Sequence, residues 1–339
     1  MSLEYQILGE PGRDNALLAT IDSGQSIHRL LFDCGEGCLS QLPIAQVGEI
    51  EALFFSHFHM DHVAGFDSFV RVNWNRPDKP VRIFGPPGTI DVIHHRLRGF
   101  IWNLAADSPG EWLVTELGDG NCHTVRLLSA EGFALRHELE ISSDQGPIYF
   151  GGCFEVHGMA LDHGTPSIGY YVHEDERSNV APERLKQLDL RPGTWLQAVK
   201  DEVNVSDEQI IDVHGEQRRA GDLRAELVAK TPGDSIAYLT DFSLVGSGGE
   251  DRLVQMLEGC QTLVCENNYR NTESELAAKY HHLTSEEVGK LAARVDPQRL
   301  ILFHLSDRYT QEDWQEQLEE VRAVFERVEF PGGWFEEPA

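Results

Sequence analysis

At residues 56–62 the sequence is Ser56-His57-Phe58-His59-Met60-Asp61-His62, directly after a short apolar run at residues 52–55. The apolar run predicts a buried strand, so these polar side chains would stand where that strand ends. Three imidazoles and a carboxylate so close together are hard to explain as packing, because each buried polar group needs a partner. A metal ion is such a partner, and His and Asp are ordinary zinc ligands. The stretch therefore predicts a metal site at a strand end.

The composition favours one large, elaborated domain. The chain has 339 residues, of which 41% are hydrophobic, enough for a sizeable core. No apolar segment approaches the ~20 residues that cross a bilayer, and residues 1–5 lack the basic and apolar regions of a signal peptide. The six cysteines are scattered, without a Cys-x-x-Cys pair, as expected of reduced thiols. We therefore expect a soluble, cytoplasmic protein without a membrane partner.

The net charge works against binding to nucleic acid without a local basic surface. The chain has 28 Lys and Arg but 56 Asp and Glu, a formal charge of −28 at pH 7. This argues against a nonspecific nucleic-acid binder, but not against an enzyme that holds a few phosphates with one basic strip and two metal ions. Residues 71–98 form one such strip, with six Lys or Arg against two Asp. They fit either a solvated helix face or a phosphate-binding surface.

The rest of the sequence alternates strands and helices. Apolar runs bounded by turn residues predict strands at residues 5–8, 16–21, 29–32, 81–84, 235–239, 262–265 and 299–303, with several more between residues 112 and 171. Helical periodicity predicts helices at residues 63–74, 89–104, 250–257, 284–295 and 314–325. Thr284 and Glu287 form a capping box at the start of one helix. This pattern predicts an α/β fold with two mixed β-sheets packed together and helices outside, an αββα sandwich.

Three more candidate ligands stand where a predicted strand meets a loop. Asp241 and His304 each follow an apolar strand directly, as His57 follows its apolar run, and His163 lies in the segment Leu161-Asp162-His163-Gly164. The repetition matters, because a single His among the fifteen in the chain is more often structural or exposed. Asp33 also follows a strand, and its carboxylate is placed either to hydrogen-bond a metal-bound imidazole or simply to form a turn.

The chain resembles the metallo-β-lactamase superfamily, whose members carry two metals at the edge between two β-sheets. The resemblance rests on ligand types in their order along the chain: His57, His59, Asp61, His62, His163, Asp241 and His304. It implies that His57, His59 and His163 hold one ion. It also implies that Asp61, His62 and His304 hold the other, with Asp241 as a bridge. A hydroxide between two metals would be the nucleophile, because the cations lower the pKa of bound water. Zinc suits these ligands, and manganese or iron use the same types.

Within that superfamily the chain resembles ribonuclease Z, the family of transfer-RNA 3′ processing endonucleases, over residues 5–310. The resemblance is carried by Leu31-Phe32-Asp33-Cys34-Gly35-Glu36-Gly37, Gly169-Tyr170-Tyr171-Val172-His173-Glu174, Glu266, His282-Leu283-Thr284 and His304-x-Ser306-x-Arg308-Tyr309. It implies that His282 protonates the leaving oxygen, that Glu266 orients His282, and that the protein is a homodimer. Ser306 and Arg308 fit phosphate binding and purely structural hydrogen bonding about equally well.

Residues 174–230 depart from that family. They align with the arm that ribonuclease Z uses to grip transfer RNA, so we expect an inserted, projecting arm within a single domain of residues 1–339. The region keeps Leu185-Lys186-x-Leu188 and Arg191-Pro192-Gly193, yet its thirteen acidic residues outnumber its nine basic ones. Phosphate contacts require positive charge. The catalytic residues therefore match the family better than the docking surface does.

The sequence leaves three functions open. The first is a ribonuclease Z-like, dinuclear-metal phosphodiesterase that cleaves a transfer-RNA precursor at its 3′ end by metal-hydroxide attack, with Asp61 also holding the hydroxide in line. The second is a hydrolase of the same fold that acts on a small phosphodiester, ester or lactone. The third is a non-enzymatic metal-binding module, which agrees poorly with a chain that has every expected ligand and a proton donor.

Overall fold

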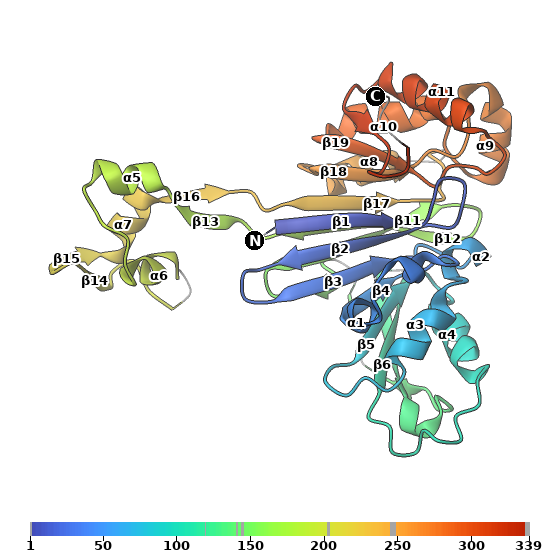
Figure 1. Ribbon diagram of the computed structural model, residues 1–339, viewed down its shortest axis with the longest axis horizontal. Coiled ribbons are helices and arrows are strands. Elements are labelled where there is room, and N and C mark those ends of the chain that lie inside the picture. Colours follow the sequence, from blue (N-terminus) through green and yellow to red (C-terminus); the bar gives the residue numbers. More distant parts are fainter. Residues whose placement is uncertain are drawn as a thin grey trace. The chain divides into compact units, whose positions relative to one another are not determined.

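The computed structural model describes residues 2–118, 120–139, 142–143, 146–201, 204–244 and 249–335 (Figure 1). The chain forms two compact units. The first comprises Met1–His173 and Asp234–Ala339, and the second comprises Glu174–Gly233. No helix in the described part of the chain is long and apolar enough to cross a membrane.

The first sheet of the larger unit has the strand order β1-β2-β3-β4-β5-β6-β7-β8, and β9 pairs with β7. Its strands are β1 Ser2–Leu8, β2 Ala16–Asp22, β3 Ile27–Phe32, β4 Ile50–Phe54, β5 Val81–Gly85, β6 Glu111–Gly118, β7 Asn121–Leu128, β8 His137–Glu138 and β9 Ser142–Ser143. Strands β1 to β3 are antiparallel, whereas β3, β4, β5 and β6 run parallel. The sheet is therefore mixed, as predicted.

The second sheet has the order β10-β11-β12-β17-β18-β19-β20. Its strands are β10 Tyr149–Phe150, β11 Phe154–Asp162, β12 Pro166–Glu174, β17 Ser235–Leu239, β18 Thr262–Glu266, β19 Arg299–Phe303 and β20 Val328–Glu329. Strands β17 to β20 run parallel, and β12 is antiparallel to β17. Because parallel strands end on the same side of a sheet, the residues that follow β17, β18 and β19 meet at one edge.

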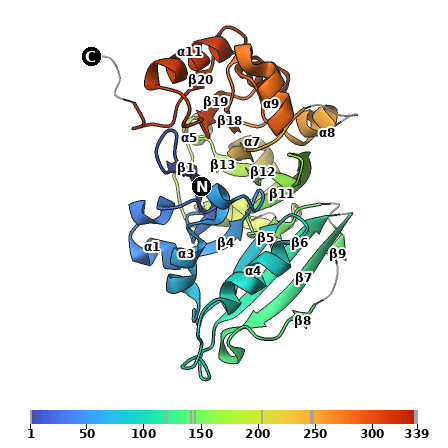
Figure 2. The same cartoon turned by 90° about the vertical axis from the view of Figure 1, so that its right-hand side faces the viewer.

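Helices cover the outer faces of both sheets (Figures 1 and 2). Those of the N-terminal half are α1 Ile44–Gly48, α2 Met60–Val63, α3 Phe66–Asn73 and α4 Thr89–Arg98. Those of the C-terminal half are α8 Gly249–Met256, α9 Ser274–Tyr280, α10 Ser285–Val295 and α11 Gln311–Arg322. Short 3₁₀ turns lie at η1 Cys38–Gln41, η2 Ser129–Glu131 and η3 Asn271–Glu273. The prediction of an αββα sandwich is confirmed.

Alternation along the strands divides the apolar side chains between three cores. On β4, Leu53 packs on the helix side with Phe66 and Phe69, whereas Phe54 faces the other sheet and packs with Phe84. A third core lies between the second sheet and helices α8, α10 and α11. The inter-sheet core holds the two sheets together beneath the edge where the parallel strands end.

One predicted helix is shorter than expected. The sequence predicted a helix at residues 89–104, but α4 ends at Arg98 and Gly99 caps it. The indole N–H of Trp102 donates to the backbone oxygen of Leu97, in the last turn of the helix, at 2.7 Å. The capping box of Thr284 and Glu287 is present at the start of α10, as predicted.

The second unit has a small core of its own. Its strands are β13 Arg177–Val180, β14 Ile210–Val213, β15 Glu216–Arg219 and β16 Val228–Thr231, which pair as β13 with β16 and β14 with β15. Its helices are α5 Pro182–Gln187, α6 Trp195–Lys200 and α7 Ala220–Leu227. Trp195, Val199 and Leu223 are among the buried side chains that they share. That this unit serves as an RNA-binding arm stays a prediction.

Replacing Phe54 by Ala tests the inter-sheet core. The Phe54 ring is fully buried, and its centroid lies 5.0 Å from that of Phe32 and 4.9 Å from that of Phe84. We expect Phe54→Ala to lower the free energy of unfolding by about 3–5 kcal/mol, because it leaves a cavity. Urea denaturation in a chelator measures this without a contribution from bound metal. Ile101→Ala is the control, since Ile101 is 88% exposed and should change stability by less than about 0.5 kcal/mol. Equal losses for the two variants would contradict the assignment.

Candidate metal centre and active site

The loops that follow the strand ends bring all seven predicted ligands together: His57, His59, Asp61, His62, His163, Asp241 and His304. His57 and His62 flank the start of the short helix α2, His163 follows β11, and His304 follows β19. Several overlapping groups in this region have ligand atoms that all lie within 4.8 Å of one another, and two of these groups, which have no residue in common, are described first. The two groups lie at the same edge of the sandwich.

The first group comprises His57, His59 and His163. The ring centroid of His57 lies 4.5 Å from that of His59 and 5.0 Å from that of His163. His57 and His163 are buried, and His59 is exposed. Three imidazoles of one group thus converge, with one of them open to solvent.

The second group comprises Asp61, His62 and His304. Asp61 Oδ2 lies 3.3 Å from His62 Nε2 and 3.4 Å from His304 Nε2. Burial raises the pKa of Asp61, but hydrogen bonds from His304 and His62 outweigh it and hold that pKa well below its usual range. The carboxylate of Asp61 therefore stays ionised beside these two rings.

The carboxylate of Asp241 lies between the two groups. Its Oδ1 is 3.6 Å from His163 Nε2, while its Oδ2 is 3.1 Å from His62 Nε2 and 3.5 Å from His304 Nε2. The hydroxyl of Thr240 donates to the same Oδ2. One oxygen of Asp241 thus faces each group, which is the arrangement that a bridging carboxylate requires.

Three of the strand-end residues adopt a left-handed backbone conformation. Asp33, Asp241 and His304 have φ angles of 58°, 53° and 52°. This region is uncommon for residues other than glycine, although Asp tolerates it better than most. Such strain persists where the surrounding structure holds it in place, often at functional sites. Here it turns side chains out of the strands and toward the centre.

Asp33 is buried beside the cluster and forms hydrogen bonds that hold it in place. Its buried carboxylate accepts hydrogen bonds from the Ser56 amide at 2.7 Å, the Ser56 hydroxyl at 2.7 Å and the Tyr238 hydroxyl at 2.9 Å. It also lies 2.8 Å from Nδ1 of His62. With Nδ1–H donating to Asp33, His62 presents Nε2 to the cluster. Of the two alternatives for Asp33, the structure shows the hydrogen bond to a cluster imidazole.

His163 is oriented in the same way by a backbone group. Its Nδ1 lies 2.9 Å from the backbone oxygen of His281, a carbonyl that can only accept. Nδ1 of His163 therefore carries the proton, and Nε2 faces Asp241. His281 lies at the end of α9 with a φ of 57°, which points its carbonyl at His163.

The donor atoms fit a bound metal ion. Nε2 of His57 is buried and forms no hydrogen bond with the described residues, although buried nitrogens normally have a partner. Burial, together with the neighbouring His62, lowers the pKa of His57 to about 2, so its ring is neutral and can ligate. The His and Asp clusters fit dinuclear metal binding.

His282 and Glu266 form a pair beside the cluster. His282 Nδ1 lies 2.6 Å from Oε2 of Glu266, which is fully buried at the end of β18. The amide of Phe242 donates to the other oxygen, Oε1, at 3.0 Å. Burial lowers the pKa of His282, but the carboxylate of Glu266 and its hydrogen bond raise it to about 9. His282 is therefore protonated at neutral pH and lies 3.8 Å from Asp241.

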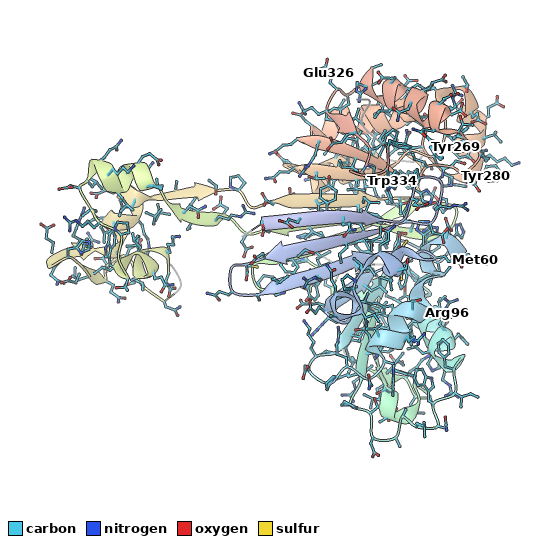
Figure 3. All side chains as sticks on the ribbon, in the orientation of Figure 1. Met60, Arg96, Tyr269, Tyr280, Glu326 and Trp334 are labelled. Carbon is cyan, nitrogen blue, oxygen red and sulfur yellow. The ribbon has the colours of Figure 1, made fainter. Side chains whose placement is uncertain are left out.

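Ser306 and Arg308 lie on the loop after His304. Ser306 Oγ accepts from Nε of Arg308 at 3.1 Å, so the two side chains hold each other. The guanidinium of Arg308 lies over the ring of Tyr269, 4.4 Å from its centroid, and that ring is 5.6 Å from His282. Figure 3 shows Tyr269 and Tyr280 at the same end of the unit as Met60. Arg308 is exposed and contacts the same tyrosine ring that lies beside His282.

Most of the basic side chains of residues 71–98 form hydrogen bonds or ion pairs with other groups of the protein. Arg76 donates to the backbone oxygens of Ile50 at 2.6 Å and Pro80 at 2.8 Å, and Arg98 donates to that of Gly132 at 3.0 Å. Arg96 pairs with Asp67 at 3.2 Å, and Lys79 pairs with Glu51. For these four side chains the structure favours a structural role over phosphate binding.

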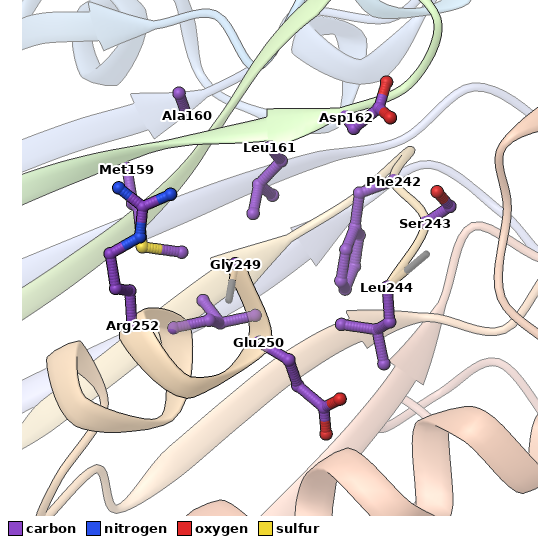
Figure 4. A pocket seen from close by; sticks show the side chains of 11 residues that line it. Met159, Ala160, Leu161, Asp162, Phe242, Ser243, Leu244, Gly249, Glu250 and Arg252 are labelled. Atoms are coloured by element: carbon purple, nitrogen blue, oxygen red, sulfur yellow. The ribbon is translucent and has the colours of Figure 1, made fainter. Parts of the chain in front are cut away.

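A cavity of about 300 Å³ is lined in part by residues that are next to the cluster residues in the sequence. Leu161, Phe242 and Leu244 lie around it, with Glu250 and Arg252 on the opposite wall (Figure 4). Two residues that line the cavity are next to cluster residues in the sequence. Asp162 directly precedes His163, and Phe242 directly follows Asp241. Apolar and charged side chains therefore both line the cavity, and its lining includes the sequence neighbours of two cluster residues.

The sequence did not reveal the hydrogen-bonding roles of Ser56, Tyr238 or the carbonyl of His281. Tyr238 lies in an apolar strand whose alternation points it inward, but alternation does not identify the carboxylate that it meets. Ser56 adjoins His57, and only the folded loop shows that it donates twice to Asp33. No sequence signal marks a backbone carbonyl.

Similarities to known proteins agree with this geometry. Residues 28–190 match the Beta-lactamase superfamily domain. Ribonuclease Z of Deinococcus radiodurans is 41% identical over 332 residues, covering 98% of each chain, and that of Pyrococcus horikoshii is 26% identical, covering 85% of this chain and 80% of that protein.

Solved structures show the same fold. The short form of human tRNase Z matches with a TM-score of 0.53 and 17% identity over 98% of this chain and 97% of that chain. The Bacillus subtilis metallo-beta-lactamase fold protein YhfI matches with a TM-score of 0.56 and 14% identity over 97% and 95%. With a near full-length relative at 41% identity, this chain belongs to the ribonuclease Z family of the beta-lactamase superfamily.

Proposed function

We propose that this protein is a zinc-dependent endonuclease that cleaves transfer-RNA precursors at their 3′ end. The observation that carries the proposal is the pair of ligand groups on either side of Asp241, with His282 held beside them by Glu266. A hydrolase that cleaves a phosphodiester needs electrostatic stabilisation and a proton donor for the leaving oxygen. The two ligand groups and His282 lie at one edge of the sandwich and would meet these two needs. Membership of the ribonuclease Z family supports RNA as the substrate.

His57, His59 and His163 would hold one ion, and Asp61, His62 and His304 the other, with Asp241 between them. When bound, two divalent ions lower the pKa of water and stabilise the negative charge that develops on a phosphate. Zinc suits a site with five imidazoles and two carboxylates, and manganese or iron are the alternatives. The buried Nε2 atom of His57, which has no hydrogen-bond partner among the described residues, supports this ligand set.

The side chains of this centre divide the remaining tasks. Asp61 would accept a hydrogen bond from the attacking water and hold it in line with the scissile bond. His282, protonated and held through Nδ1, presents Nε2 to the leaving oxygen and gives it a proton. Glu266 positions His282 and stabilises its charge. Ser306 and Arg308 would contact a phosphate next to the one that is cleaved.

The second unit would supply RNA contacts through a few unpaired basic side chains. Several arginines there are already neutralised, as in the pairs Arg218 with Glu226 and Arg224 with Asp207. Lys186, Arg191 and Lys200 are exposed and form no ion pair within the described part of this unit. Three such cations fit a docking surface that makes few phosphate contacts. That the protein acts as a homodimer in the cytoplasm stays a prediction.

His282→Gln tests the proton donor. We expect it to slow cleavage of a transfer-RNA precursor by about 10²–10⁴-fold, because the leaving ribose oxygen needs a proton. Cleavage of a nitrophenyl phosphodiester should fall far less, since that leaving group departs as an anion. Single-turnover rates on both substrates, with zinc content measured by elemental analysis, provide the comparison. Equal losses on both substrates would contradict a role in protonation.

The neighbouring His281→Gln is the matched control. The side chain of His281 is partly exposed and its Nδ1 lies 3.7 Å from Oδ1 of Asp162, whereas only its backbone oxygen contacts His163, so this variant should keep both activities. A protein that cleaves only the small diester, or only a lactone, would point instead to the small-substrate hydrolase.

Metal removal tests the centre itself. Chelation should abolish cleavage, and zinc should restore it with two ions per chain. Asp241→Ala should reduce both the zinc content and the cleavage rate, since its oxygens face both groups. If manganese or iron restores cleavage and zinc does not, the metal of the centre is manganese or iron rather than zinc. Full activity in the metal-free protein would contradict the proposal as a whole.

Charge removal in the second unit tests RNA docking. Lys186→Gln combined with Arg191→Gln should weaken precursor binding and reduce the slope of log affinity against log salt by up to about 2, because each cation that neutralises a phosphate adds about one to that slope. Arg218→Gln combined with Arg219→Gln also removes two positive charges, but from side chains that are paired with Glu226 and Glu208, and it should leave the slope unchanged. Binding titrations at several salt concentrations measure both. A slope that is the same in all three proteins would place docking elsewhere.

A further inference from the structure

We infer that Glu155, His157 and His173 form a separate site for a divalent transition-metal ion such as Zn²⁺. They lie on the second sheet, Glu155 and His157 on β11 and His173 on the adjacent β12. Each offers one ligand atom, and the three atoms lie within 4.8 Å of one another. None of them belongs to the centre described above.

Strand alternation places the three side chains on one face. Phe154 and Val156 of β11, and Val172 of β12, are buried between the sheets. Because successive side chains of a strand point to opposite faces, Glu155, His157 and His173 must point away from that core. All three are partly exposed, so an ion reaches them without any unfolding.

The side chains are already arranged around a common point. Nε2 of His157 lies 3.1 Å from Oε2 of Glu155. The rings of His157 and His173 are parallel to within 3°, with centroids 6.2 Å apart. Ligand atoms around one Zn²⁺ sit ~3.3 Å from one another, as follows from metal–ligand distances of about 2.0–2.2 Å in a tetrahedron. Small side-chain rotations therefore suffice to bring the third atom into place.

The backbone of the site is rigid. Strand β11 pairs with β10 on one side, with Phe150 opposite Glu155, and β12 pairs with β17 on the other, with His173 opposite Ser235. Ligands on paired strands keep their spacing better than ligands on loops. Two imidazoles and a carboxylate are a normal zinc donor set, and water completes the coordination. The formal charge of −28 also favours the approach of a cation.

The site is remote from the catalytic centre. His163 follows the end of β11, whereas Glu155 and His157 lie near its start. His163 lies six positions after His157 along the chain, about 20 Å at ~3.3 Å per residue of strand. An ion here would tie β11 to β12 immediately before Glu174, where the chain leaves the first unit. The two metal sites can therefore be emptied independently.

Zn²⁺ titration of the metal-free full-length protein tests the inference. Equilibrium dialysis at micromolar Zn²⁺ with elemental analysis should find three ions per chain in the parent. His157→Gln and His173→Gln should each bind two and keep the cleavage activity of the parent. Circular dichroism confirms that each variant is folded, and two variants on different strands guard against a folding defect in one.

Two controls separate this site from other His–Glu pairs and from the proposed function. His123→Gln removes a histidine that pairs with Glu138 at 2.6 Å and has no third ligand among the residues that the structure describes, and this variant should still bind three ions. A variant with His62→Ala and His163→Ala should lose the centre yet keep one ion, which His157→Gln then removes. The inference is overturned if the parent binds no more Zn²⁺ than His157→Gln and His173→Gln do, whatever the cleavage activity is.

Discussion

The buried carboxylate of Asp33 is the group on which the arrangement of the centre depends. A carboxylate shielded from water is stable only when its oxygens are hydrogen-bonded. Asp33 meets this requirement with four donor groups: the amide and hydroxyl of Ser56, the Tyr238 hydroxyl and His62 Nδ1. Ser56 follows a strand of the first sheet, whereas Tyr238 belongs to the second. One side chain thus joins the two sheets at the edge where their parallel strands end, and it fixes the orientation of His62.

The orientation of the other cluster residues follows from similar constraints. Once Nδ1 of His62 is engaged, its Nε2 faces Asp61 and Asp241, and the carbonyl of His281 does the same for His163. These contacts set ring tautomers as well as positions, so the nitrogens that face inward can act as ligands. The left-handed backbone at Asp33 and Asp241 has an unfavourable energy that the surrounding packing and hydrogen bonds offset. The centre is therefore organised by groups that do not themselves face it.

Much of this could be predicted from the sequence, because strand ends and ligand types are both local features. His57, Asp241 and His304 each follow an apolar run, and that pattern marked them as candidate ligands, whereas the resemblance to the metallo-β-lactamase superfamily implied that they meet at one edge. The partners of Asp33 could not be predicted, since Tyr238 lies 205 residues away and meets it only when the sheets pack. Helix periodicity did not predict the end of α4 at Arg98, where Gly99 caps the helix and Trp102 donates a local hydrogen bond to Leu97. His157 and His173 are both histidines in strands, and only the pairing of β11 with β12 makes them neighbours.

The acidic character of the chain is compatible with a polyanionic substrate because the charges are distributed unevenly. Asp61 and Asp241 would be neutralised by the ions that they hold, while the histidine ligands add no negative charge, so the local field at the centre becomes positive. In the second unit, Arg218 and Arg224 are neutralised by Glu226 and Asp207, which leaves Lys186 and Arg191 as exposed cations. Beyond about 10 Å, salt screens the remaining carboxylates at physiological ionic strength. Recognition of RNA would then depend on the metal centre and a few cations, with the net charge acting mainly on the rate of approach.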